Sequence, residues 1–572
     1  MAKVVEASAT KLIVECVGYT GTKVSGLFDK SFGKIYCHLC GVSFNIARSR
    51  VPGEPELAKW DYTGRQPDLA VDEVDEEECA RNGCHAAVRH PKGGDDPLDD
   101  PDYTPPETEE EDEEEDESHD EYKSDCRSIG GLDEADTNSD GNIEDEWYQD
   151  HLFDTNITQD CLPGEPLWIP LGRRNEDVFP IASEHWPQQY EPDDLEHIAG
   201  PNCAEPNAYS GHAISMEEMQ GCRTAQFLIH KGASGAQWQP DGLDEDWERS
   251  DEWFLSGLCD GMASRDDCFQ EVYPLRGGIS RPRSENVNFD PEYTQGNEYA
   301  LPFHPWCFDI FCRQSKLHFR CVNVSGLMKW RNAEFSWEDF REFPRTGDVV
   351  GAQEQFWRHE PGNEYLAANP LYVPRLLPLL NSAVTTEGHP PGAFDLSCRP
   401  SCHRDESADP LAVLPLDIRL LVLDYLGSRD IANLRLASRA YEQLPVGLWY
   451  RLIREEMPWL WEAWDETERG HRPSLWTSVT ANGARLLNQR RQHYTRVLRE
   501  EGHVDNLDDA LDYLLPWPES ATPSHKLPRG QTNWYQLYTE VKRNWPQLKG
   551  LRNRQRIWED VDEIIYRIKQ KS

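Results

Sequence analysis

The sequence runs Leu414-Pro415-Leu416-Asp417-Ile418-Arg419-Leu420-Leu421-Val422-Leu423-Asp424-Tyr425-Leu426 before a polar break at Gly427-Ser428-Arg429. Proline is favoured in the first turn of a helix, where its missing N–H leaves no hydrogen bond unmade. Helical spacing then places five large side chains on one face: Ile418, Leu421, Val422, Tyr425 and Leu426. The polar break ends this helix, and Ser428 or Asp430 can cap the next one.

Two further short helices are predicted directly after this break. The second helix takes its apolar positions from Ile431, Leu434 and Leu436, and Ala437-Ser438-Arg439-Ala440-Tyr441 turns into the third. Three short helices within about 30 residues bury too little surface to be very stable alone. We therefore expect this segment to need a partner or an adjoining domain.

This segment resembles an F-box. The family pattern has Leu-Pro, an acid with Ile, an aliphatic pair, an aromatic with Leu, Asp with an aliphatic, and Ser-Arg before an aromatic. These features appear in register at Leu414-Pro415, Asp417-Ile418, Val422-Leu423, Tyr425-Leu426, Asp430-Ile431, Leu434, Ser438-Arg439 and Tyr441. Ala437 and Tyr441 depart from the usual Val and Trp. The match covers about Pro410 to Trp449, and the alternative is a helical hairpin of an all-α domain.

The resemblance implies a docking surface for the small adaptor subunit of SCF-type cullin ubiquitin ligases, and through it for a cullin. The rest of the chain would select an unknown protein substrate. Apolar anchors provide most of the energy when a helix docks in a groove. The anchors carried over are Leu414, Pro415, Ile418, Val422, Leu423, Leu426, Leu434 and Tyr441, some of which must form the segment's own core.

On this reading the chain is not an enzyme. Two alternatives stay open. The chain could act with the adaptor outside a ubiquitin ligase, or its middle part could be an enzyme tethered by the F-box. Co-purification with the adaptor, with or without a cullin, separates the two binding roles. No phosphate-cradling glycine loop, nucleophile elbow or two-histidine metal helix stands in the sequence.

Composition limits the partners and the compartment. The 572 residues carry 103 acidic and 58 basic side chains, a formal net charge of -45. Such a chain repels phosphate groups, which argues against nucleic acids and anionic membranes as partners. No export signal is visible and no apolar run reaches the roughly 18 residues of a membrane span. We therefore expect a cytoplasmic or nuclear protein whose 16 cysteines are reduced thiols or metal ligands.

The predicted fold class is multidomain α+β. Residues 1–93 read as a small β-containing cysteine module, and residues 94–147 as an acidic disordered linker because 25 acids there meet only two basic residues. A loop-rich, Trp- and Pro-rich α+β domain follows at 148–405, a candidate for substrate recognition. The F-box spans 408–455, and 456–572 is an all-α C-terminal region. Its last helix carries an apolar stripe of Ile557, Trp558, Val561, Ile564, Ile565 and Ile568.

A structural zinc site is predicted in the N-terminal module. Cys37-His38-Leu39-Cys40-Gly41 has the form of a zinc knuckle, in which two thiolates bracket a tight turn. A tetrahedral site needs a second pair, and Cys79 and Cys84 are the nearest cysteines. The predicted ligands are thus Cys37, Cys40, Cys79 and Cys84. The alternative is a set of buried free thiols.

Other motifs favour structural roles. Residues Asp136 to Ile143 copy the first part of a calcium loop, but Trp147 stands where its bidentate Glu belongs. His304-Pro305-Trp306-Cys307 places an imidazole near a thiol, yet its aromatic surroundings favour a buried helix start over catalysis. Cys398 and Cys402-His403 lie in a Pro-rich connection.

A second, looser resemblance lies in the middle of the chain. Three segments resemble pieces of large fungal F-box proteins of unassigned substrate: Glu196-His197-Ile198-Ala199-Gly200-Pro201, Gly221-Cys222-Arg223 and Leu301 to Phe308. This resemblance implies a shared architecture and carries no activity with it.

Overall fold

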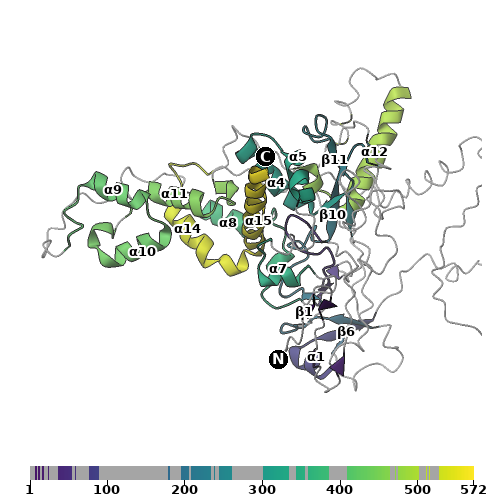
Figure 1. Cartoon of the computed structure of the whole chain (residues 1–572). Helices are drawn as coiled ribbons and strands as arrows, with labels where there is room; N and C mark the ends of the chain where they lie inside the picture. The colour runs from purple at the N-terminus through teal and green to yellow at the C-terminus, as the bar shows by residue number, and fades with distance from the viewer. Residues whose placement is uncertain are drawn as a thin grey trace, which may run out of the picture.

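Figure 1 shows the computed structural model of the chain. It describes residues 7–8, 11–12, 16–17, 23–24, 36–54, 58–59, 76–88, 178–180, 195–204, 208–233, 238, 244–260, 300–333, 343–353, 359–384, 409–442, 444–463, 471, 474–500, 511, 515 and 527–571. A body and a projecting arm are joined where the last helix stands (Figure 1).

The body is built around one antiparallel sheet. Its central strand is β10 (Thr224–His230), which pairs with β11 (Trp253–Leu255), β12 (Cys259–Asp260) and β13 (Leu301–Phe303). Six of the seven β10 residues are buried. Because successive side chains point to opposite faces of a sheet, both faces of β10 are covered.

Three helices pack beside this sheet. They are α4 (Pro305–Phe319), α5 (Val324–Ala333) and α15 (Lys549–Lys571), and α15 contacts both of the others. The apolar stripe predicted for the last helix is buried along its length: Ile557, Trp558, Val561, Ile564, Ile565 and Ile568. That prediction is confirmed, and its physical basis is the 3.6-residue period of the helix.

N-terminal segments share the core of the body. Strand β5 (Arg48–Ser49) pairs parallel with β9 (Tyr209–Ser210), and β6 (His85–Val88) pairs with β7 (Val178–Pro180) and β8 (Leu195–Ile198). Arg50 and Lys59 both contact the buried Glu196 carboxylate at 2.6 Å. The described residues between 36 and 88 therefore pack with the middle of the chain rather than as a core of their own.

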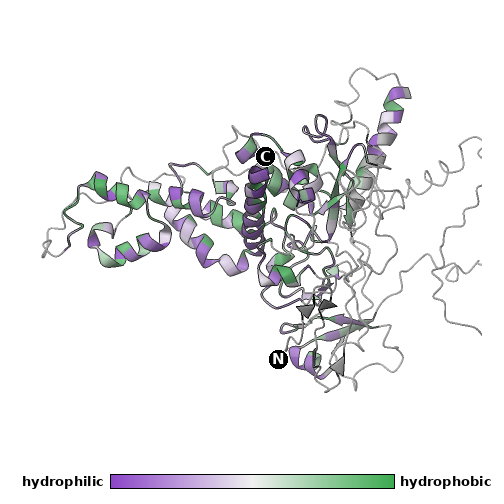
Figure 2. Cartoon of the chain, in the orientation of Figure 1, coloured by the Kyte–Doolittle hydropathy of each residue, from purple (hydrophilic) through white to green (hydrophobic). Residues whose placement is uncertain are grey.

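In the described part of the chain, the arm contains five α-helices that come from three parts of the sequence. The helices are α8 (Leu376–Ser382), α9 (Leu416–Asp424), α10 (Ser428–Ala437), α11 (Val446–Glu456) and α14 (Trp534–Arg543). α14 contacts α11 and α8, while α9 and α10 lie at the far end (Figure 1). Hydrophobic residues run along α9, whereas the visible side of α15 is mostly hydrophilic (Figure 2).

The remaining elements are short, apart from α12. They are β1 (Ala7–Ser8), β2 (Lys11–Leu12), β3 (Cys16–Val17), β4 (Lys23–Val24), α1 (Glu76–Asn82), α7 (Gly347–Gly351), η7 (Glu364–Leu366), η9 (Arg439–Tyr441), η10 (Trp461–Ala463), η12 (Leu475–Thr477), α12 (Ala481–Glu500) and η13 (Trp545–Gln547).

The expected mixture of helices and small sheets is confirmed. The acidic segment 94–147, its calcium-like motif and the Cys398 to His403 connection lie outside the described residues. Within the described part of the chain, no helix combines the length and apolar character that a membrane crossing needs.

Candidate partner-docking surface and metal clusters

Helices form where the sequence predicts them at the arm end. α9 begins directly after Pro415, and α10 begins at Ser428 with Gly427 in the capping position. The expectation that Ser428 or Asp430 caps α10 is wrong. The capping position is occupied by Gly427, which has no side chain to accept a hydrogen bond. Instead, the Ser428 N–H donates to a carboxylate oxygen of Glu456 at 2.8 Å. A residue of α11 therefore takes over the capping role.

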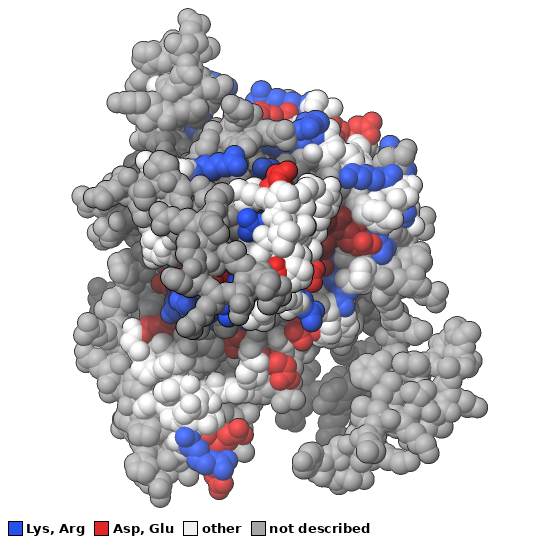
Figure 3. Space-filling view, turned by 90° about the vertical axis from the view of Figure 1, so that its left-hand side faces the viewer, with Lys and Arg blue, Asp and Glu red and all other residues white. Residues whose placement is uncertain are grey.

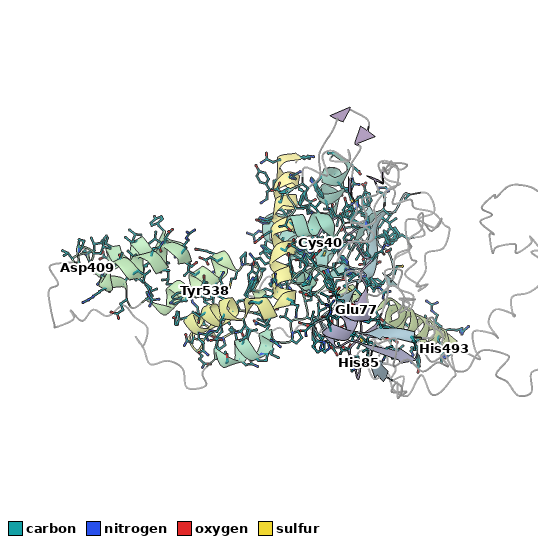
Figure 4. The ribbon with its side chains drawn as sticks, turned by 90° about the horizontal axis from the view of Figure 1, so that it is seen from below. Cys40, Glu77, His85, Asp409, His493 and Tyr538 are labelled. Carbon is teal, nitrogen blue, oxygen red and sulfur yellow. The ribbon has the colours of Figure 1, made fainter. Side chains whose placement is uncertain are left out.

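Polar contacts fix these helices to one another. The Arg451 guanidinium donates to the carbonyl oxygens of Leu423 at 2.7 Å and Leu426 at 3.0 Å, which satisfies the end of α9. The Ser438 hydroxyl donates to Asp409 at 2.8 Å. Figure 4 places Asp409 at the far end of the arm, with Tyr538 between it and the body. The arm end is thus a fixed scaffold for its exposed side chains.

Burial divides the eight predicted anchors. Leu423 and Tyr441 are 1% and 0% exposed and belong to the core of the arm. Ile418 is 39% exposed, and Pro415 is exposed as well. The other four are half-buried: Leu414, Val422, Leu426 and Leu434. The structure therefore sorts core positions from surface positions, which the sequence left open.

A set of exposed apolar side chains gathers in the same segment. Of the eleven large hydrophobic residues that are exposed in the described part of the chain, five fall between 413 and 436. We call these five the arm-end set: Val413 (81% exposed), Ile418 (39%), Leu421 (50%), Tyr425 (83%) and Leu436 (89%). Figure 3 looks onto the side to which the arm points, and shows uncharged surface with charged side chains around it. Clustered exposed apolar groups typically mark interaction surfaces.

Four members of this set were not among the predicted anchors. Leu421 and Tyr425 share the helix face of Ile418, so the periodicity of α9 already indicated them. Leu436 was expected at an apolar position of α10 but not as an exposed residue. No signal in the sequence singled out Val413.

Among the residues that the structure describes, two groups of buried cysteine and histidine side chains in the body can hold a metal ion. The first, the Cys37 cluster, contains Cys37, Cys40, His304 and Cys307, all buried, with donor atoms within 4.8 Å of one another. The second contains Cys79, Cys84 and His197, with the same spacing limit and burial. Figure 4 shows Cys40 in the body beside α15.

The Cys37 cluster joins a knuckle to the start of α4. The Gly41 N–H donates to the Cys37 carbonyl at 2.7 Å, and Gly41 has φ +76°, a conformation that glycine adopts freely. From the other side, His304 precedes α4 and Cys307 lies in its first turn. The Cys40 sulfur lies 3.5 Å and the Cys307 sulfur 3.9 Å from Nδ1 of His304.

The outer nitrogen of His304 has its own partner. Nε2 lies 3.0 Å from the carbonyl oxygen of Cys222, to which it can only donate. This leaves the lone pair of Nδ1 directed at the sulfurs, which is the tautomer that a metal ligand requires. Three thiolates and one imidazole are a closed tetrahedral donor set, typical of structural zinc.

Electrostatics in the Cys37 cluster favour separated charge. Burial alone would lower the pKa of His304, but the nearby Cys37 and Cys40 sulfurs raise it to about 10. Burial alone would raise the pKa of Cys40, but hydrogen bonds with Cys307 and Cys37 and the charge of His304 bring it well below its usual value. Among these sulfurs, Cys40 is thus favoured as a thiolate, the form in which cysteine binds metals, whereas burial raises the pKa of Cys307 well above its usual value.

The four cysteines predicted as one zinc site do not meet. Cys37 and Cys40 lie in one cluster, while Cys79 and Cys84 lie in the other. Each pair finds its remaining donors in the middle of the chain, because the N-terminal strands pair there. The cluster members that the sequence prediction missed, His304, Cys307 and His197, fall in segments of the looser resemblance. Cys222, whose carbonyl oxygen faces His304, falls in the third such segment. The expected buried helix start at Pro305 is present.

Comparisons with known proteins find one short local match and no family. No family model matches the chain, and no solved structure matches it. A stretch of 61 residues is 53% identical to the mitochondrial ATP-dependent RNA helicase mss116 of Aspergillus oryzae. The match spans 10% of this chain and 10% of the helicase.

This match corrects one prediction from the sequence. The expectation that the chain is not an enzyme is contradicted, because the matched stretch points to an enzyme family. The chain spans about a tenth of the helicase's length, so the match transfers neither the activity nor the partners of that protein.

Proposed function

We propose that the chain is an F-box protein that recruits a protein substrate to an SCF-type cullin ubiquitin ligase in the cytoplasm or nucleus. The observation that carries this proposal is the arm-end set, five exposed apolar side chains on and beside α9 and α10. They lie at the far end of the arm, away from the body, within the segment that resembles an F-box (Figure 1).

Burial supports docking through this set rather than through the whole predicted anchor list. Leu423 and Tyr441 cannot reach a partner without unfolding the arm, since both are 1% exposed or less. Tyr425 and Leu436 expose more than four-fifths of their surface and are directly accessible to a partner. Apolar side chains that become buried when a partner binds typically contribute about 2 kcal/mol or more each to the binding free energy.

The body provides the second surface that a recruiting subunit needs. It is built mainly from described residues that precede α8 and from α15, which carries buried apolar side chains on one side and charged groups on the other. We assign substrate recognition to the body, in particular to the described parts of 148–405.

Co-purification with the adaptor tests this function. The double variant Leu421→Ala/Tyr425→Ala should lose the adaptor by at least about a hundredfold in affinity, the sum of two anchors of about 2 kcal/mol each with allowance for non-additivity. Tyr566→Ala is the matched control, because Tyr566 is 57% exposed but lies on α15 of the body. Undiminished adaptor binding by the double variant would overturn the proposal. Adaptor without cullin would indicate a role outside a ligase.

Structural zinc is the occupant that we assign to the Cys37 cluster. The donor set is closed, buried and supported by the hydrogen bond from His304 to the Cys222 carbonyl. Cys307→Ser should release zinc from full-length protein, whereas Cys321→Ser, which changes an exposed cysteine, should not. Equal zinc content of the two variants, measured by elemental analysis, would refute the assignment.

A further inference from the structure

The second cluster joins α1 to β8. Cys79 lies in α1 and Cys84 follows the turn after it, and both are buried. His197 lies on β8, where Ala86 of β6 is its pairing partner. The Cys79 sulfur is 3.6 Å from Nε2 of His197. Two thiols and an imidazole thus converge at a point where the N-terminal and middle segments pair.

A fourth donor lies beside these three. The sulfur of Cys203 is 3.8 Å from Nε2 of His197, the nitrogen that Cys79 also faces. Cys203 therefore faces the same histidine nitrogen as Cys79.

The backbone before Cys203 is shaped to bring it there. The Cys203 N–H donates to the Gly200 carbonyl at 3.1 Å, which closes a turn, and the Gly200 N–H donates to the Cys84 sulfur at 3.3 Å. A Cβ at Gly200 would lie 2.2 Å from the Asn82 carbonyl oxygen, so only glycine fits. Gly200 is thus pressed against the turn that carries Cys84. The N–H to sulfur contact also stabilises a thiolate.

We propose that Cys79, Cys84, His197 and Cys203 form a second tetrahedral zinc site, with Cys203 as the ligand that completes it. The donor set of three sulfurs and one nitrogen matches that of the Cys37 cluster and suits zinc. In both sites a cysteine pair from residues 37–84 meets a histidine and a cysteine from residues 197–307. This inference is independent of the proposed function of the arm.

Such a site would close a long loop of the chain. Cys79 and His197 are 118 positions apart, so an ion that binds both restricts the unfolded chain strongly. Binding energy of a structural zinc is folding energy, and the ion would hold β6 against β8. Cys203 is less buried than the other three ligands, so exchange of the metal is expected to begin at this residue.

Cobalt substitution of the full-length protein tests the proposal. Tetrahedral cobalt reports each bound thiolate through a charge-transfer absorption, and the two sites together would supply six thiolates. Wild-type protein should bind about two metal ions per chain, and Cys203→Ser should lower the thiolate absorption by about one sixth. In the zinc-bound protein, Cys203→Ser should also let a competing chelator remove one of the two zinc ions before the other.

Two controls make the outcome decisive. Cys321→Ser should leave the metal content and the spectrum unchanged, because Cys321 is exposed and belongs to neither cluster. Cys307→Ser should affect the Cys37 cluster and leave the second metal bound. One metal per chain in wild type, lost on Cys307→Ser, would overturn the second site. Two metals with an unchanged spectrum in Cys203→Ser would overturn the assignment of Cys203.

Discussion

The Arg556 guanidinium donates to the carbonyl oxygen of Cys40 at 2.6 Å, across 516 positions of sequence. Arg345, which pairs with Asp560 of α15, also donates to the Leu39 carbonyl at 3.2 Å. The C-terminal helix thereby binds the backbone of the N-terminal knuckle. The Cys37 cluster is thus supported from a helix that carries none of its ligands.

Replacing Arg556 should weaken the knuckle. Arg556→Ala leaves the Cys40 carbonyl and the Asn553 side chain without their buried donor, and we expect a loss of about 3 kcal/mol in stability. Faster zinc release should accompany it, measured with a colorimetric chelator. Glu559→Ala, on the exposed side of the same helix, is the control. Equal release rates in both variants would contradict a supporting role of Arg556.

Stability and docking should separate within the arm. Ile431→Ala removes a side chain that is 1% exposed and should destabilise the arm by about 3 kcal/mol. Leu436→Ala, in the same helix but 89% exposed, should leave the melting temperature unchanged and weaken adaptor binding. Calorimetry and a binding titration on both variants check this, and a destabilised Leu436→Ala would contradict the placement of Leu436 outside the core.

Acid should loosen the contact between α10 and α11 through Glu456. Burial alone would raise the pKa of this carboxyl, but hydrogen bonds from the Ser428 N–H and from Tyr538 bring it below its usual value of 4.5. A lowered pKa contributes stability above the unfolded value, and this is lost as the pH falls through the folded value. The stability difference between wild type and Glu456→Gln should therefore shrink below about pH 4.5. A difference that is independent of pH would contradict this role.

Gly200→Ala should affect the second cluster selectively. The added Cβ would meet the Asn82 carbonyl at 2.2 Å and push the Cys203 turn away from Cys84. On the second-site proposal, this variant keeps about one zinc per chain instead of two. Gly351→Ala is the control, because open space surrounds a Cβ there. Two retained zinc ions in Gly200→Ala would show that the close contact is not needed for the site.

The helices could be predicted because their pattern depends on residues a few positions apart. The complete metal clusters could not, because their members are widely separated in the sequence. The stripe from Ile557 to Ile568 and the face from Ile418 to Leu426 depend on residues a few positions apart. His304 and Cys40 are 264 positions apart, and only the fold brings them together. His304 and Cys307 do repeat the spacing of Cys37 and Cys40. The sequence pattern was interpreted only as catalysis against a buried helix start, although structural metal sites are themselves buried.

Arg554 connects the arm to the body through buried contacts. Its side chain is 0% exposed and donates to the Pro370 carbonyl at 2.6 Å and to Glu462 at 2.7 Å, with the guanidinium over the Trp461 ring. Pro370 precedes α8 and Glu462 follows α11, so one side chain of α15 ties both to the body. A partner bound at the arm end would consequently keep a set distance and orientation relative to anything bound by the body. The reach of such an assembly is set by the length of the arm.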